Sequence, residues 1–340
     1  MIEKELNKEL LKKTAKELVI KGKGILAADE SEPTIKKRFD AIGLESTEEN
    51  RRKYRELLFT TPGIKDYISG VILFEETLKQ QDKNGTPFPE LLAKRGIIPG
   101  VKVDEGKKPF HDSPDEFETQ GLESLKERLQ GYSESGVKFA KWKAVVNIGD
   151  GLPTHAMMSI NATYLGRYAI ICQEQDVVPI IEPEVLMDGK HDIDRCEEVT
   201  LEMLGLVFEE LKNYKVELSG ILLKPNMVLP GKESDENITS KEIAERTMRV
   251  LKKVVPEEVP GIVFLSGGQS PEEATKNLQT INAEYPDAPW NLSFSFGRAL
   301  QAPVLKSWLG KDENVEESQK IFLEIAKRNG KATQFRYNEE

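Results

Sequence analysis

Residues 219–226 read SGILLKPN, an apolar run that ends in Lys224 and is stopped at once by proline and asparagine. A short apolar run bounded by turn residues is typical of a buried strand. Burial of a lysine at the tip of such a strand favours the neutral amine, which can attack a carbonyl and form a Schiff base. The alternative is a lysine whose side chain extends past the strand end and keeps its charge in water.

Seven further runs repeat this pattern of an apolar stretch with a polar or charged residue at or near its end. They are 24–28 before Asp29, 69–74 before Glu75, 97–103 with Lys102, 137–146 with Lys141 and Lys143, 177–181 before Glu182, 261–265 before Ser266, and 292–296 before Gly297 and Arg298. Helical stretches separate most of them, and strands alternating with helices predict a parallel sheet. Eight such strands predict a closed (β/α)8 TIM barrel in the α/β class. We expect a single domain over residues 1–340, with an N-terminal amphipathic helix and a short C-terminal tail.

Helix starts are marked by capping signals in the segments between these runs. Residues 46–49 (STEE) and 239–242 (TSKE) each resemble a capping box, and 270–273 (SPEE) adds a proline at the first helical position. Proline costs nothing there because its missing N–H would have no partner inside the helix.

The composition excludes several classes of protein. The chain carries a net charge of −10 with its basic residues scattered, which argues against binding to nucleic acid. No apolar stretch approaches the roughly 20 residues that span a bilayer, so we expect no membrane partner. Two cysteines and an acidic N-terminus without an apolar signal core predict a reduced, cytoplasmic protein.

In a (β/α)8 barrel the carboxyl ends of the strands form one rim, and that rim holds the active site. The polar strand ends should therefore converge there. They are Asp29, Glu75, Lys102, Lys141, Lys143, Glu182, Glu184, Lys224, Ser266 and Arg298.

Two pairs of like charges stand at i and i+2, namely Lys141 with Lys143 and Glu182 with Glu184. In extended chain this spacing puts both members of a pair on one face of the sheet. Neighbouring strands would bring both pairs and Lys224 together, and one carboxyl could then act as a general acid and base. The alternative is a structural salt-bridge network, since such networks also shift pKa values.

The glycines of LSGGQ at 265–269 precede a helix start, where backbone N–H groups can turn toward an anion. Gly297 and Arg298 follow the eighth run, and phosphate sites of barrels often lie after strands seven and eight. Residues 36–38 (KKR) lie just beyond Asp29 and could add a second phosphate contact, although such a run is usually a solvated helix face. A glycine turn alone is equally compatible with an ordinary loop.

We expect neither a metal nor an organic cofactor. His111, His155 and His191 lie far apart and show no zinc-ligand spacing. The GKG at 22–24 precedes its strand instead of following it, which argues against a dinucleotide site. Lys224 is then the available electron sink for activating a carbonyl.

Taken together, these motifs resemble class I fructose-bisphosphate aldolase. The matching stretches follow the family's order over nearly the whole chain. They are 24–31 (GILAADES), 48–52 (EENRR), 70–78 (GVILFEETL), 139–142 (FAKW), 179–184 (PIIEPE), 222–227 (LLKPNM), 264–269 (FLSGGQ) and 297–302 (GRALQA).

The resemblance implies a role for each matching residue. Lys224 would form an iminium with fructose 1,6-bisphosphate, Glu182 would shuttle protons, and Asp29, Lys141 and Glu184 would orient the substrate. The phosphate at carbon one would contact Arg38, Ser266, Gly267 and Arg298, and Gly297 would also bind substrate. The phosphate at carbon six would lie near Ser31, Thr34, Lys102 and Lys143. The family also tends toward tetramers, which implies a homo-oligomer.

The chain departs from the family pattern at two places. Lys143 stands where the family usually has arginine, so the grip on the second phosphate should differ, because lysine lacks the bidentate fork. The tail ends soon after Tyr337, which is not an assured equivalent of the family's terminal tyrosine. Other readings are an aldolase for another phosphorylated ketose such as sedoheptulose bisphosphate, an isomerase, or a non-catalytic scaffold on the same barrel.

Overall fold

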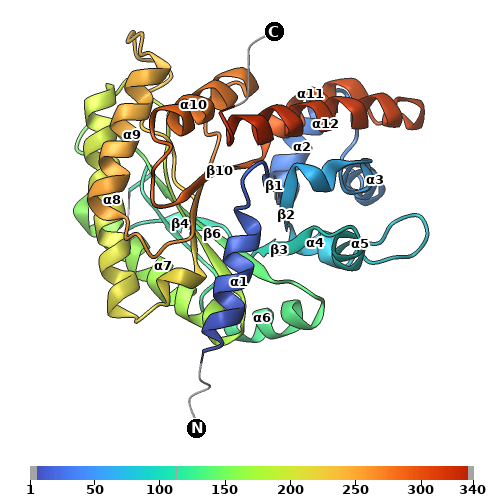
Figure 1. Cartoon of the computed structure of the whole chain (residues 1–340), viewed down its shortest axis with the longest axis horizontal. Coiled ribbons are helices and arrows are strands. Elements are labelled where there is room, and N and C mark those ends of the chain that lie inside the picture. Colours follow the sequence, from blue (N-terminus) through green and yellow to red (C-terminus); the bar gives the residue numbers. More distant parts are fainter. Residues whose placement is uncertain (1–5, 112, 336–340) are drawn as a thin grey trace.

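The computed structural model describes residues 6–111 and 113–335, and its centre is a closed barrel of eight parallel strands (Figure 1). Around the barrel the strands follow the order β1, β10, β9, β8, β7, β6, β3, β2. Their bounds are β1 Gly24–Ala28, β2 Ile68–Leu73, β3 Ile98–Lys102, β6 Phe139–Val146, β7 Val178–Val185, β8 Leu222–Leu223, β9 Gly261–Phe264 and β10 Asn291–Phe296. The eight apolar runs therefore form the eight barrel strands, and the predicted fold is confirmed.

Helices surround the barrel, and one crosses its N-terminal end (Figure 1). They are α1 Lys8–Leu18, α2 Glu32–Asp40, α3 Glu48–Thr60, α4 Glu75–Leu78, α5 Phe88–Lys94, α6 Leu125–Glu134, α7 His155–Glu174, α8 Ile193–Asn213, α9 Ser240–Val254, α10 Pro271–Glu284, α11 Arg298–Trp308 and α12 Val315–Ala332. Among residues 6–111 and 113–335, no helix combines the length and the apolar character needed to cross a bilayer.

The barrel interior changes from apolar to charged along its axis. At the N-terminal end, Ile25, Phe139 and Val178 pack with Leu11 and Leu18 of α1 in one buried cluster. Because side chains alternate along a strand, the inward positions further along are the charged residues of the rim. The helix α1 thus closes one end of the barrel, and the charged cavity occupies the other.

The sixth strand is shorter than its apolar run predicts. β8 covers only Leu222–Leu223, and a 3-10 turn at Leu218–Gly220 precedes it. A side-chain carbon added to Gly220 would lie 2.7 Å from Cβ of Leu11, so this turn packs tightly under α1. Pro225 then ends the strand because it has no N–H to donate to a ladder.

The fifth strand is longer than predicted. β7 continues past Ile181 to Val185 and pairs with β6 along its whole length. Lys143 lies opposite Glu182, and Val145 lies opposite Glu184. The two glutamates are therefore held inside a regular strand, which fixes their direction.

A small hairpin of β4 (Lys107–Pro109) and β5 (Phe117–Thr119) flanks the loop expected around the proline-rich residues 109–114, and of the described residues in that range only Pro109 lies in a strand. The Thr119 hydroxyl donates a 2.8 Å hydrogen bond to the carbonyl of Lys143, which ties the hairpin to β6. These strands are only three residues long and mostly polar, so they lack the apolar alternation that reveals a strand in sequence.

Helix capping follows the predicted signals with one difference. Ser270 caps α10 in a complete capping box with Glu273, and Thr239 caps α9 by accepting from the N–H of Glu242. At α3 the cap is Thr47, and its oxygen accepts from the N–H of Asn50, so no glutamate stands at the third position. Such a cap still pairs one of the N–H groups left free at the helix start.

Candidate active site

A cavity of about 680 Å³ opens at the carboxyl end of the barrel strands. Every residue predicted from the sequence to be catalytic or to bind substrate lines this cavity. These are Asp29, Ser31, Thr34, Arg38, Lys102, Lys141, Lys143, Glu182, Glu184, Lys224, Ser266, Gly267, Gly297 and Arg298. Residues from across the chain thus converge because all eight parallel strands point the same way.

A chain of buried charges crosses the floor of this cavity. Nζ of Lys224 lies 3.1 Å from Oε1 of Glu182, and Oε2 of Glu182 lies 3.2 Å from Nζ of Lys141. Lys141 also lies 2.7 Å from Oδ2 of Asp29. The side chains of Lys141, Glu182 and Lys224 are only 4–5% exposed, so water scarcely screens these contacts.

The lysines hold both carboxyl groups in the ionised form. Burial raises the pKa of Asp29 and of Glu182, but nearby Lys141 and Lys224 outweigh it and lower both values. Burial likewise lowers the pKa of Lys141, yet Asp29, Glu182 and Asp104 raise it well above its usual range. Lys141 is therefore a fixed cation, and it stabilises negative charge on either carboxylate.

One carboxylate oxygen of Glu182 can accept a further hydrogen bond. Its Oε2 is buried and within ion-pair range of Lys141, but it accepts no hydrogen bond from the described part of the chain. Sequence reasoning favoured a neutral Lys224, and the structure places the Glu182 carboxylate beside its Nζ. The Lys224–Glu182 pair can therefore supply a nucleophile and a proton acceptor in one step.

Sequence reasoning missed Glu30, which organises one wall of the cavity. Its carboxylate accepts hydrogen bonds from Arg38, from Arg55 at 2.6 Å and from Gln301 at 2.8 Å. Arg55 comes from α3 and lies outside the matching stretches, whereas Gln301 comes from α11 and lies within 297–302 but was assigned no role. Because ion-pair partners so far apart leave no spacing signal, only the tertiary structure reveals them.

Sequence reasoning also missed Asp104, although its i, i+2 spacing from Lys102 pointed to it. It stands two residues after Lys102, whose Nζ lies 2.6 Å from Oδ1 of Asp104. Its Oδ2 accepts a hydrogen bond from the N–H of Lys143 and lies 3.9 Å from Nζ of Lys141. The i, i+2 rule that identified the lysine pair would also have identified Asp104.

The glycine turn after β9 lies beside Arg298, as the order of the strands predicted. Gly267 has φ of 55°, a left-handed conformation that glycine adopts at little cost. Arg298 donates a hydrogen bond to the carbonyl of Gly267. Within residues 6–111 and 113–335, no carboxylate lies within ion-pair distance of Arg298, so its charge is open to an anion.

At the other end of the cavity the cations already have partners. Lys143 lies 2.9 Å from Glu184, and Lys102 is paired with Asp104. The hydroxyl groups of Ser31 and Thr34 are 3.1 Å apart. An anion bound here would compete with carboxylates for the lysines.

Two expectations about the rim need correction. Glu75 does not line the cavity, because it begins α4 and pairs on the surface with Lys79 at 3.2 Å. Lys36 likewise turns outward to Asp40, while Lys37 and Arg38 face the cavity. Tyr337 lies outside the described residues.

Comparison with known proteins agrees with this geometry. The family model for class I fructose-bisphosphate aldolase, a glycolytic family, matches residues 9–340. The chain is 52% identical over 335 residues to a fructose-bisphosphate aldolase of Drosophila melanogaster, covering 98% of this chain and 92% of the relative. It is 53% identical over 312 residues to the cytosolic fructose-bisphosphate aldolase 6 of Arabidopsis thaliana, covering 92% and 87%.

A solved structure of fructose-bisphosphate aldolase from Plasmodium falciparum has the same fold. It superimposes with a TM-score of 0.96 at 50% identity, over 98% of this chain and 96% of that one. The chain therefore belongs to the class I fructose-bisphosphate aldolases, the carbon–carbon lyases of glycolysis.

Proposed function

We propose that Lys224 carries the aldol cleavage of fructose 1,6-bisphosphate through a Schiff base with the ketone carbon. The observation that supports it most directly is the 3.1 Å contact between Nζ of Lys224 and Glu182 on the floor of the cavity. Glu182 takes the lysine proton, and the amine attacks carbon two. A proton moves from the attacking nitrogen to the former ketone oxygen, and Glu182 then gives its proton to the resulting hydroxyl, so water leaves and an iminium remains.

The iminium is the electron sink for bond cleavage. As the bond between carbons three and four breaks, its electron pair moves toward the nitrogen and forms an enamine. The hydroxyl proton on carbon four passes to a carboxylate, and glyceraldehyde 3-phosphate leaves. Glu182 is placed best to accept that proton, because its Oε2 accepts no hydrogen bond from the described residues. Protonation and hydrolysis of the enamine release dihydroxyacetone phosphate.

Asp29, Lys141 and Glu184 set the field and orient the substrate. Lys141 stays charged between Asp29 and Glu182, so it stabilises the ionised form of Glu182. Glu184 is one inward position further along β7 and faces the hydroxyl groups of the sugar chain. Groups fixed in this way need no reorganisation during the reaction.

The two ends of the cavity hold the two phosphates. Arg38, Ser266, Gly267, Gly297 and Arg298 bind the phosphate at carbon one. Ser31, Thr34, Lys102 and Lys143 bind the phosphate at carbon six. The open charge of Arg298 and the paired charge of Lys143 predict tighter binding at carbon one.

Borohydride trapping tests the central role. The protein is treated with dihydroxyacetone phosphate and borohydride, digested, and analysed by mass spectrometry. We expect a reduced adduct on Lys224. An adduct on another lysine, or none, would overturn the proposal.

Substrate choice is tested with ketoses that differ in phosphate number and chain length. We expect fructose 1,6-bisphosphate to be cleaved with a higher kcat/KM than fructose 1-phosphate, because two cationic ends face the cavity. Faster cleavage of sedoheptulose bisphosphate would favour that ketose as the substrate.

We further propose that residues 1–340 fold as one domain, that the protein is a homotetramer, and that it works in the cytoplasm. Support comes from the continuous barrel and from relatives named as cytosolic enzymes. Light scattering coupled to size-exclusion chromatography should give a mass about four times that of one chain, and a monomer mass would contradict the tetramer.

A further inference from the structure

Lys232 lines the active-site cavity, although no motif in the sequence pointed to it. Its side chain lies across Gly268, the residue that follows Ser266 and Gly267. A side-chain carbon added to Gly268 would meet Cε of Lys232 and would lie 2.8 Å from its Nζ. The ammonium group therefore sits on the backbone of the glycine turn.

The backbone on both sides of Lys232 is firmly held. The N–H of Lys232 donates a 2.7 Å hydrogen bond to the carbonyl of Met187, and the N–H of Gly231 donates one of 2.8 Å to that of His191. Gly231 also packs so closely on Gly189 that a side chain there would collide with the Gly189 carbonyl. The segment is thus fastened to the loop after β7, beside the mouth of the cavity.

The tip of Lys232 is held only weakly. Its Nζ lies 3.4 Å from Oδ1 of Asp188, and the two side chains are 41% and 71% exposed. Exposed ion pairs contribute about 0–1 kcal/mol, so a stronger anion can take the lysine from Asp188 at little cost.

The charge of a phosphate monoester calls for a second cation at this end of the cavity. Such a group carries about −1.5 to −2 at neutral pH. Arg38 also binds this phosphate but shares its charge with Glu30, and Arg298 supplies a single open charge. Lys232 is the further cation of the cavity that lies on the glycine turn itself.

We propose that Lys232 is a substrate-binding residue that leaves Asp188 to clamp the phosphate at carbon one against the Ser266–Gly268 turn. This inference rests on the proposed function, because it takes that turn as the phosphate site. Lys232 acts on binding and not on the bond-breaking step, since its partners are the turn and Asp188 and not Lys224 or Glu182.

The test compares Lys232→Ala with Lys190→Ala, which removes an exposed lysine of the neighbouring loop that does not line the cavity. For Lys232→Ala we expect KM to rise about 10- to 100-fold, the range for one lost hydrogen bond to a charged group. The rise should appear with fructose 1,6-bisphosphate and fructose 1-phosphate alike, with kcat within about twofold. Lys190→Ala should change neither constant, and Lys232→Arg should restore most of the loss.

Gly268→Ala displaces the lysine without deleting it. The three atoms nearest to the new methyl group all belong to the flexible end of Lys232, which can move aside without a shift of the turn. We expect this variant to raise KM in the wild-type background and to add nothing in the Lys232→Ala background. A full additional rise in the double variant would contradict a role exerted through Lys232.

An unchanged KM in Lys232→Ala, or a rise confined to the bisphosphate, would overturn the inference. Borohydride trapping separates this failure from failure of the proposed function. If the wild type and Lys232→Ala both give the Lys224 adduct at saturating dihydroxyacetone phosphate, the Schiff base stands whatever Lys232 does. If the wild type gives no adduct, the proposed function fails first.

Discussion

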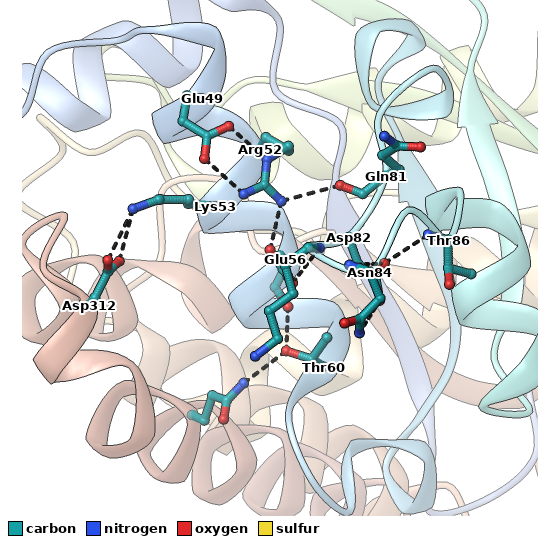
Figure 2. Close-up of polar contacts among 12 residues, drawn as sticks. Glu49, Arg52, Lys53, Glu56, Thr60, Gln81, Asp82, Asn84, Thr86 and Asp312 are labelled. Atoms are coloured by element: carbon teal, nitrogen blue, oxygen red, sulfur yellow. Dashed lines mark hydrogen bonds and ion pairs between the residues drawn. The ribbon is translucent and has the colours of Figure 1, made fainter.

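The charged floor of the cavity and the charged surface of α3 use the same chemistry in opposite surroundings. In Figure 2, Arg52 contacts Glu49, Glu56 and the carbonyl of Gln81, while Lys53 contacts Asp312. These distances, 2.6–3.2 Å, match those around Glu182. Burial separates the cavity floor from Glu49 and Asp312, which are 58% and 76% exposed, whereas Glu56 is intermediate at 15%.

Burial decides what each region can do. On α3 each carboxylate of the cluster already has a cation or N–H partner, and water screens the rest. On the floor of the cavity, Lys141, Glu182 and Lys224 are almost fully buried, so the protonation state of each depends on its neighbours. Removing one charged residue from an exposed cluster changes the free energy of unfolding little. Removing one from a buried cluster leaves its partner as an uncompensated buried charge.

The sharpest test of this contrast is Lys224→Met. It removes the nucleophile and leaves Glu182 with Lys141 as its ion-pair partner. We expect kcat for fructose 1,6-bisphosphate to fall by a factor of at least about 10⁴, because loss of a covalent nucleophile leaves only residual catalysis. Steady-state kinetics check it, and turnover at the wild-type rate would refute the Schiff-base mechanism.

Glu182→Gln should have the next largest effect. It keeps the shape of the side chain but removes the proton acceptor beside Lys224. General acid–base catalysis contributes about 10²- to 10⁴-fold, and we expect a loss of kcat within that range. Glu56→Gln, a similar change in the α3 cluster, should leave kcat unaltered. An equal loss of kcat in both variants would contradict the difference between the two regions.

Acid should destabilise the protein through the buried carboxyl groups. The folded-state pKa of Asp29 is depressed, so the stability it contributes is complete above its unfolded pKa of about 3.9 and is lost as the pH falls toward the folded value. Urea unfolding between pH 7 and pH 3 should show stability falling below about pH 4.5. Asp29→Asn should flatten this slope, while Glu49→Gln on α3 should leave it nearly unchanged.

Lys143→Arg sharpens the comparison at the carbon-six end of the cavity. Lys143 is half-buried and paired with Glu184, between the two extremes of exposure. An arginine fork could hold Glu184 and a phosphate together, so we expect KM for fructose 1,6-bisphosphate to fall about threefold. KM for fructose 1-phosphate should stay constant, and an equal fall for both substrates would contradict binding at carbon six.

Lys53→Met should have the smallest effect. Its contact with Asp312 is exposed, so we expect a change of less than about 0.5 kcal/mol in the free energy of unfolding and none in kcat. Urea denaturation and steady-state kinetics check this. A loss above 2 kcal/mol, on the scale of about 3–5 kcal/mol for a broken buried pair, would show that exposure does not separate the two regions.

Prediction from sequence succeeded where a residue's role follows from its place along a strand. The eight apolar runs gave the barrel, and the i, i+2 spacing placed Lys141, Lys143, Glu182 and Glu184 on the inner face. It failed for Glu75, because a charge after an apolar run can equally start a surface helix. It also failed for Glu30, Arg55 and Lys232, whose partners come from distant segments.

The order of residues alone determined that this chain forms a parallel barrel and that Lys224 stands at a strand end, since alternation and chain direction are local properties. Only the packed structure decided that Glu182 lies 3.1 Å from Lys224. It also decided that Glu30 forms an ion pair with Arg38 and that the side chain of Lys232 lies against Gly268. Charges interact through space over a few ångströms, and their strength depends on how much water the fold excludes. Neither the separation nor the exclusion of water is written in the spacing of residues along a chain.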